Sequence, residues 1–316
     1  MYIGGSGRSG STLLERMLAC MPGYWSVGEA EFIWQRGLQR NDRCGCGARF
    51  RECAFWTQVG EIGFGGWDQV DVDEAVRLRT TVDRHRNVVR LAGPRSGGKL
   101  AADVTAYAQL TDRLYQAVRE ASGAAVIVDS SKNVSYALLL RGLPSFDLRL
   151  VHLVRRSHGV AYSWSKRVRK PGVGDGSEFM SVHTPSWAIG LWLADNVLYD
   201  ALGWRLPRAT RVRYEDLVAD PRAELGRAVR EIDLPAADLT LGFLSDSTAD
   251  STAELPSSHA LSGNPMRVQR GQVVLRTDDE WRTAMSRRRQ AAISAATWPL
   301  LLRYGYPIAP RAHQHP

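Results

Sequence analysis

The sequence predicts a three-layer α/β fold in which helices cover both faces of a central parallel sheet. Short apolar segments near residues 1–4, 124–128, 148–154 and 209–214 have the character of buried strands, and helical patterns alternate with them. The chain has 316 residues, 44% of them hydrophobic, so it can bury a full core. We expect residues 1–316 to form one domain.

The first predicted strand leads through a Gly/Ser-rich turn into an amphipathic helix. Leu13, Leu14 and Met17 begin an apolar series at helical spacing, and a Pro-Gly pair ends it. A strand, a glycine-rich turn and a helix N-terminus in this order make a phosphate cradle, because backbone N–H groups converge there and the helix dipole favours negative charge. Ser11 and Thr12 add hydroxyl donors.

The spacing of this turn copies the nucleotide-binding P-loop except at one position. Gly5, four further residues, and then Gly10, Ser11 and Thr12 match the motif, but Ser11 replaces its lysine. That lysine normally reaches the β- and γ-phosphates, so its absence argues against ATP or GTP as a phosphoryl donor. A cation stands instead at Arg8, whose planar guanidinium can clamp a smaller anion.

A second strand-turn-helix unit carries another cation at an equivalent place. Arg155 ends the strand near 148–154, and Ser163 lies one turn into the helix expected over 160–169. Ligands of open α/β sheets bind outside the carboxyl ends of the strands. Both side chains should therefore face the same crevice as Arg8.

These two units resemble the sulfotransferases that use 3′-phosphoadenosine-5′-phosphosulfate (PAPS), in particular their actinobacterial and cyanobacterial branch. The resemblance implies a P-loop-like α/β fold, PAPS as co-substrate and the 3′,5′-bisphosphate PAP as product. Arg155 and Ser163 would grip the ribose 3′-phosphate. The 5′-phosphosulfate would lie against the first turn, which consists of Arg8, Ser9, Gly10, Ser11 and Thr12.

Three further segments fit the same resemblance. Tyr214 begins a Tyr-Glu-Asp-Leu segment whose tyrosine lies near the adenosine in the family; the alternative, which we favour less, is a strand residue that only packs the core. Lys132 follows a strand that ends in a functional lysine in bacterial and tyrosyl-protein sulfotransferases. A late basic loop folds over the nucleotide in the family, which here implicates Asn264, Met266 and Arg267, with Arg270 beside them.

Sulfuryl transfer needs a base for the acceptor hydroxyl and positive charge for the leaving group. Arg8 suits the leaving phosphate, and Lys132 suits the bridging oxygen. The resemblance places a catalytic glutamate soon after the donor loop, which favours Glu29 as the base and leaves Glu31 as the alternative. His259, in the late loop, is a third candidate.

A rival interpretation is a P-loop kinase or NTPase. Residues 124–129 form an apolar strand that ends in Asp129, which in an ATPase would bind Mg²⁺. The missing P-loop lysine and the second phosphate site favour sulfuryl transfer, for which we expect no metal to be required.

Residues 23–110 are expected to form a mostly helical insertion on the acceptor side, and residues 250–280 a mobile cap over the nucleotide. The aromatic residues after the donor loop either form an apolar acceptor wall or belong to the ordinary core; they are Phe32, Trp34, Phe50, Phe55 and Trp56.

Cys44, Cys46 and Cys53 lie within ten residues of one another. A closed zinc site needs four ligands, and Cys20 would have to supply the fourth. We favour a tight Gly-rich hairpin with buried thiols or one disulfide, and we assign no metal site.

The net charge of +8 and the pI near 9.6 indicate an anionic partner, for which PAPS suffices. No nucleic-acid-binding motif accompanies this charge, so we expect no nucleic acid partner. The sequence shows no signal peptide or transmembrane segment, and its four cysteines suggest a reducing compartment, hence the cytoplasm. The expected acceptor is a small-molecule hydroxyl of a phenol, alcohol or sugar, as in bacterial secondary metabolism, and a homodimer is left open.

Overall fold

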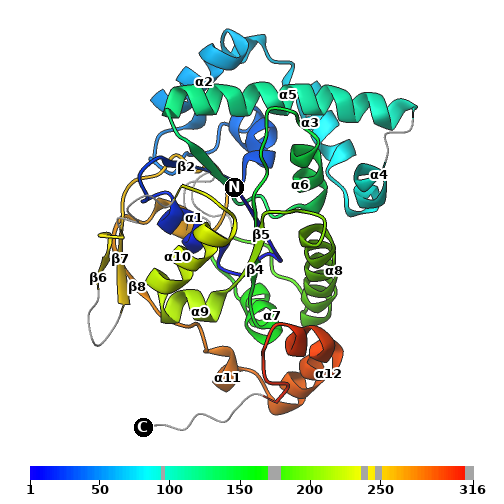
Figure 1. Ribbon diagram of the computed structural model, residues 1–316, viewed down its shortest axis with the longest axis vertical. Helices are drawn as coiled ribbons and strands as arrows, with labels where there is room; N and C mark the ends of the chain where they lie inside the picture. Colours follow the sequence, from blue (N-terminus) through cyan, green and yellow to red (C-terminus); the bar gives the residue numbers. More distant parts are fainter. Residues whose placement is uncertain (94–96, 170–178, 236–240, 246–250, 310–316) are drawn as a thin grey trace.

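The computed structural model describes residues 1–93, 97–169, 179–235, 241–245 and 251–309. A parallel five-stranded sheet of order β2-β3-β1-β4-β5 forms its centre (Figure 1). The strands are β1 (Tyr2–Gly4), β2 (Tyr24–Gly28), β3 (Val126–Asp129), β4 (Leu150–Val154) and β5 (Ala209–Arg213). Parallel strands buried on both faces read as continuous apolar runs, and β4 is buried along its whole length.

Helices cover both faces of this sheet, which confirms the predicted fold class. One face packs against α1, α9 and α10, whose apolar residues share a core with Val151, Leu153 and Val212 of the strands. The other face packs against α6 and α8, where Leu150 and Tyr199 belong to a second core. The bounds of these helices are α1 Ser11–Leu18, α6 Val134–Arg141, α8 Pro185–Gly203, α9 Tyr214–Ala219 and α10 Pro221–Glu231.

Most of the segment 23–110 is helical, but its first element is a strand that we did not predict. β2 pairs with β3 at the edge of the sheet, in parallel register from Tyr24 opposite Val126. Long-range pairing decided this strand, because five residues after a turn carry little periodicity of their own. The α-helices of the segment are α2 (Ala54–Phe64), α3 (Val72–Val82), α4 (Val88–Ala92) and α5, which spans Lys99–Ser122. A π-helix, Ile33–Gln39, and short 3₁₀ turns precede or connect them. Residues 94–96 of this segment lie outside the described residues.

A small antiparallel sheet occupies much of the predicted cap. It consists of β6 (Leu244–Ser245), β7 (Ser251–Leu255) and β8 (Gly271–Leu275), with Ser251 opposite Leu275. Ala253 and Leu255 of β7 are buried in the same core as α1. This sheet was not predicted, and residue 250 of the predicted cap lies outside the described residues.

The C-terminal part of the described chain packs beside β4. It contains α11 (Trp281–Ala284) and α12 (Arg287–Arg303), which pack against α7 (Ser157–Ser165), the helix that follows β4. Trp192 of α8 and Tyr304 after α12 join Val154 in one apolar cluster. Across the described residues, none of the helices has the length and apolar character needed to cross a membrane.

The turn between β1 and α1 requires glycine at a specific place. Gly10 has φ 93°, a left-handed conformation that side chains rarely adopt, and it caps α1. A Cβ atom there would lie 2.5 Å from Cδ2 of Tyr214. The ring of Tyr214 therefore packs directly against the turn.

We predict that Gly10→Ala lowers the free energy of unfolding by about 2–5 kcal/mol, measured by urea denaturation. Left-handed backbone costs an alanine about 1–2 kcal/mol, and overpacking adds about 1–3 kcal/mol. Gly123→Ala is the matched control, because Gly123 also has positive φ (63°) but no atom within 4 Å of the added Cβ. If both variants lost the same free energy of unfolding, the contact between the added Cβ and the ring of Tyr214 would contribute nothing.

Candidate functional site

A cavity of about 600 Å³ opens at the carboxyl ends of the central strands. Thirteen of the predicted site residues line it: Arg8, Gly10, Ser11, Thr12, Glu29, Glu31, Lys132, Arg155, Ser163, Tyr214, Asn264, Met266 and Arg267. They come from six separate parts of the chain: residues 8–12, 29–31, 132, 155–163, 214 and 264–267. The fold thus brings together what the sequence pattern predicted, while Ser9 lies behind the turn, 1% exposed.

The turn between β1 and α1, called the donor turn below, carries Arg8, whose guanidinium has hydrogen-bond donors without a partner among the described residues. Arg8 has φ 68°, and its Nη1 donates to Sδ of Met180 at 3.0 Å. Its guanidinium lies over the ring of Trp164, 4.9 Å from the centroid. Nε and Nη2 of Arg8 are buried and have no partner among the described residues. Burial lowers the pKa of Arg8, because a desolvated cation is destabilised, and the negative charge of Glu29 offsets this only in part.

The second cation, Arg155, is paired with an acid. Its Nη2 lies 3.1 Å from Oδ2 of Asp278, and its Nη1 donates to the backbone oxygen of Arg8 at 3.1 Å. The guanidinium stacks on the ring of Tyr214 at 4.6 Å. Burial raises the pKa of Asp278, but the charge of Arg155 outweighs this and holds it below its usual value.

Lys132 and Glu29 form an ion pair between the two predicted catalytic segments. Nζ of Lys132 donates to Oε1 of Glu29 at 2.7 Å, and Oγ of Ser262 donates to Oε2 at 2.6 Å. Lys132 itself has φ 64°, a strained conformation that turns the chain directly after β3. Burial raises the pKa of Glu29, but the charge and hydrogen bond of Lys132 outweigh it, and the net shift is downward.

Glu31 differs from Glu29 in its electrostatic environment. Its side chain accepts a hydrogen bond from Nδ2 of Asn133 at 3.0 Å, and Nη2 of Arg79 lies 3.8 Å away. Burial outweighs these contacts and raises the pKa of Glu31 to about 7. The two glutamates are therefore shifted in opposite directions, with the pKa of Glu29 below its usual value and that of Glu31 above it.

The late loop is fastened to α1 and to the donor turn. Nη1 of Arg16 donates to the backbone oxygen of Met266 at 2.7 Å. The N–H of Asn264 reaches Oγ1 of Thr12 at 3.4 Å. Arg267 is 5% exposed and lines the cavity, whereas Arg270 donates to the backbone oxygen of Cys46 and does not line it.

The sequence matches the profile of the sulfotransferase family over residues 1–238. The chain belongs to this family. It is therefore an enzyme of sulfuryl transfer, and the family generally takes its sulfuryl group from PAPS. Among curated proteins, none matches the chain in sequence.

Two solved structures share the fold of this sulfotransferase. The sulfotransferase domain of the olefin synthase from Synechococcus PCC 7002 is 20% identical, with a TM-score of 0.50, over 98% of this chain and 94% of that one. The sulfotransferase domain from the curacin biosynthetic pathway is 17% identical, with a TM-score of 0.54, over 98% of each chain.

Asp129, the residue on which the kinase interpretation rests, does not line the cavity of this sulfotransferase. Its carboxylate accepts hydrogen bonds from the hydroxyl of Tyr115 and from the backbone N–H of Ser131 at 2.6 Å. It is 1% exposed. The acid therefore braces the end of β3 from inside the core, and among the described residues it belongs to no group of side chains that could hold a metal ion.

His259 also faces away from the cavity. Its ring stacks on Trp25 with the centroids 5.7 Å apart, and Nδ1 lies 3.2 Å from Sγ of Cys53. It lines a separate, small pocket beside Arg16 and Tyr24. Of the three residues weighed as bases from the sequence, Glu29 and Glu31 line the cavity and His259 does not.

Sequence reasoning missed several residues of the cavity wall. Arg36 and Arg79 lie over the ring of Phe32, at 4.4 and 4.3 Å from its centroid. Asn133 and Asp278 contact Glu31 and Arg155. An arginine on a helical segment has no sequence pattern that marks it as part of a site. The role of Arg36 and Arg79 in the cavity wall follows only from the packing of residues 23–110. Of the aromatic residues weighed as an acceptor wall, Phe32 lines the cavity and the others are buried core: Trp34, Phe50, Phe55 and Trp56.

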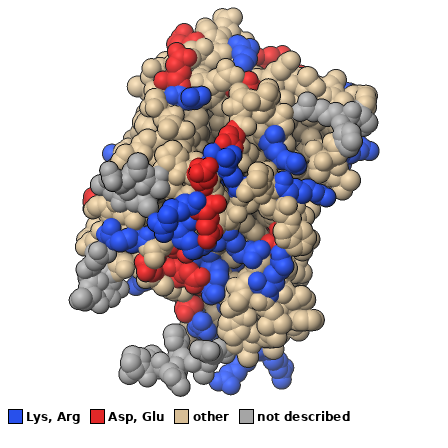
Figure 2. All heavy atoms as spheres, viewed as in Figure 1, with Lys and Arg blue, Asp and Glu red and all other residues tan. Residues whose placement is uncertain are grey.

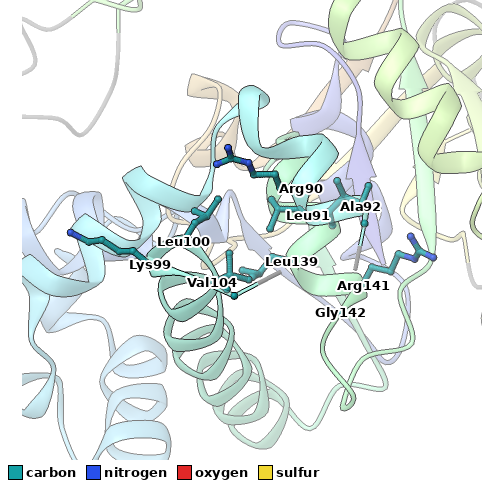
Figure 3. A pocket seen from close by; sticks show the side chains of 13 residues that line it. Arg90, Leu91, Ala92, Lys99, Leu100, Val104, Leu139, Arg141 and Gly142 are labelled. Atoms are coloured by element: carbon teal, nitrogen blue, oxygen red, sulfur yellow. The ribbon is translucent and has the colours of Figure 1, made fainter. Parts of the chain in front are cut away.

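Two further surface features do not add to the site. A second cavity between α4, α5 and α6 has Leu91, Val104 and Leu139 in its wall, and none of the predicted site residues lines it (Figure 3). On the face shown in Figure 2, Lys and Arg are interspersed with Asp and Glu and form no continuous basic band over the described residues.

Proposed function

We propose that this sulfotransferase transfers the sulfuryl group of PAPS to a hydroxyl of a small-molecule acceptor. One observation carries the proposal: a single cavity holds two cations at the ends of adjacent strands, each suited to one phosphate. Arg8 has buried donors without partners, and Arg155 is paired with the displaceable Asp278. A donor with a 5′-phosphosulfate and a 3′-phosphate satisfies both.

In the proposed reaction the acceptor oxygen attacks sulfur in line with the bridging oxygen. The bond from sulfur to the bridging oxygen breaks, PAP leaves with the electron pair, and a base takes the hydroxyl proton. Arg8 and the N–H groups of the donor turn stabilise the 5′-phosphate. Protonated Lys132 stabilises the charge that develops on the bridging oxygen.

Glu29 is the proposed base. Its carboxylate is ionised at neutral pH and touches Lys132, the group assigned to the bridging oxygen, so it lies beside the reacting atoms. When the phosphosulfate takes over the charge of Lys132, the carboxylate is freed to accept the acceptor proton. Glu31 lies on the side of Arg79 and Asn133 and is proposed to orient the acceptor.

The wall around Phe32 supports a polar acceptor. Arg36 and Arg79 both lie against its ring, and His85 lines the same cavity. We propose a phenol, alcohol or sugar that carries a polar or anionic group near the hydroxyl.

We predict that Arg155→Ala and Ser163→Ala weaken the binding of PAP more than that of adenosine 5′-phosphosulfate, which lacks the 3′-phosphate. Loss of a charge-assisted hydrogen bond costs about 1.5–3 kcal/mol, so the affinity for PAP should fall roughly 10- to 150-fold in Arg155→Ala. Isothermal titration calorimetry measures both ligands. Arg8→Ala is the control and should weaken both ligands. Equal losses for the two ligands in Arg155→Ala would reject the assignment of the 3′-phosphate site.

We predict that Asp278→Asn binds PAP about two- to fivefold more tightly at low salt. The carboxylate competes with the 3′-phosphate for Arg155 and repels it, and half-exposed ion pairs are worth up to about 1 kcal/mol. Asp279→Asn is the neighbouring control. Weaker binding by Asp278→Asn would mean that the acid helps to hold the nucleotide.

We predict that Glu29→Gln lowers kcat about 10²- to 10⁴-fold and leaves the affinity for PAP almost unchanged, as expected for a general base. Glu31→Gln should act mainly on the KM of the acceptor. Steady-state kinetics with a sulfuryl-acceptor panel and labelled PAPS separates the two effects.

The pH profile of the wild-type enzyme tests the same assignment independently. The pKa of Glu29 lies below its usual value, so kcat/KM should be flat from pH 6 to 8. If Glu31 were the base, kcat/KM would rise through its pKa of about 7 as the pH increases. A rising profile together with an inactive Glu31→Gln would transfer the role of base to Glu31.

A further inference from the structure

Cys44, Cys46, Cys53 and His259 form a compact cluster outside the cavity. One ligand atom from each residue lies within 4.8 Å of the others, although His259 is more than two hundred residues away in sequence. Sγ of Cys53 lies 3.7 Å from Sγ of Cys44 and of Cys46. Nδ1 of His259 lies 3.2 Å from Sγ of Cys53 and 3.7 Å from Sγ of Cys44.

Four of the six separations, at 3.2–3.7 Å, are close to the edges of a tetrahedron around one zinc ion, and all six lie within 4.8 Å. A Zn–S bond of about 2.3 Å implies S···S edges of about 3.8 Å, and a Zn–N bond of about 2.0 Å implies S···N edges of about 3.5 Å. The four cysteines of the chain are free, so the disulfide considered from the sequence does not form. The fourth ligand atom comes from His259 and not from Cys20.

The backbone prepares the cluster on both sides. The N–H of Cys44 donates to the oxygen of Ala48 at 2.9 Å, which closes the Gly-rich hairpin. The N–H of Gly45 donates to the oxygen of Ala260 at 2.9 Å, and Nε1 of Trp56 donates to the oxygen of His259 at 3.0 Å. Stacking on Trp25 fixes the imidazole plane, with an angle of 12° between the rings.

We propose that Cys44, Cys46, Cys53 and His259 bind one structural Zn²⁺. Three thiolates and an imidazole are ligands that zinc prefers, and four protein ligands leave no open position for a substrate. Iron–sulfur clusters distribute their thiolates over two or more irons, which this spacing does not allow. On binding, the three thiols lose their protons, and the charge of Zn²⁺ offsets two of the three thiolates.

The zinc would fasten the late loop to the hairpin of residues 43–49. Directly after His259, the loop supplies Ser262 to Glu29 and Asn264 to Thr12. Arg270 adds a hydrogen bond to the backbone oxygen of Cys46 at 2.6 Å. The metal therefore has a positioning role at a distance from the reacting atoms, and its presence does not depend on the proposed donor or base.

The test is the metal content of the purified full-length protein, measured by inductively coupled plasma mass spectrometry. We expect about one zinc per chain in the wild type. Cys46→Ser and Cys53→Ser should lose most of it, while Cys20→Ser, which lies outside the cluster, should retain it. Less than about one tenth of an equivalent in wild-type protein after reloading with Zn²⁺ would overturn the proposal, as would equal loss in Cys20→Ser.

Two measurements on the wild type avoid variants that fail to fold. Protein reloaded with Co²⁺ should show the thiolate charge-transfer and d–d absorption of tetrahedral cobalt, and an octahedral spectrum would contradict the proposal. Removal of the metal by a chelator should speed tryptic cleavage after Arg267 and Arg270, as followed by mass spectrometry. An unchanged cleavage rate would overturn the positioning role. Zinc in a chain that fails to bind PAP would reject the proposed function and leave the metal site standing.

Discussion

The central place of β1 in the sheet is the constraint on which the candidate site depends. β3 lies on one side of β1 and β4 on the other, so the chain reverses its direction of sheet growth at this strand. A crevice forms at such a switch point, outside the carboxyl ends of the strands. The turn that carries Arg8 therefore lies between Lys132, which follows β3, and Arg155, which follows β4. The order of the strands in the sheet, and not the local sequence of any one segment, brings these three side chains together.

Two cations in the cavity are neutralised by carboxylates that an anionic ligand could replace. Lys132 is paired with Glu29, and Arg155 with Asp278, while Arg8 has buried donors without a partner. Without ligand, the carboxylate of Asp278 lowers the free-energy cost of burying Arg155. A bound phosphate would have to replace this carboxylate, so the free energy gained on binding there is smaller. Arg8 lacks this compensation, so the donor turn is where an anion gains most.

The late segment completes the site by contacts that are far apart in sequence. Arg16 of α1 holds the backbone of Met266, Ser262 holds the carboxylate of Glu29, and the cysteine cluster holds His259. The family profile ends at residue 238, so the geometry of this segment comes from the structure alone. The small antiparallel sheet is connected to α1, the helix that follows the donor turn, through the apolar core that β7 shares with this helix.

The sequence by itself determined the strands β1, β3, β4 and β5, the glycine turn with Arg8, and the membership in the sulfotransferase family. These features are local: a run of apolar residues, a left-handed glycine and a helix cap are all dictated by neighbours in the chain. It also indicated which residues meet, because carboxyl ends of parallel strands share one edge. Tertiary structure alone decided that β2 joins the sheet edge, that Asp278 pairs with Arg155, and that His259 meets three cysteines. It also set the opposite pKa shifts of Glu29 and Glu31, which are buried glutamates two residues apart. Lys132, at 2.7 Å, outweighs burial at Glu29, whereas Arg79, at 3.8 Å, does not outweigh it at Glu31.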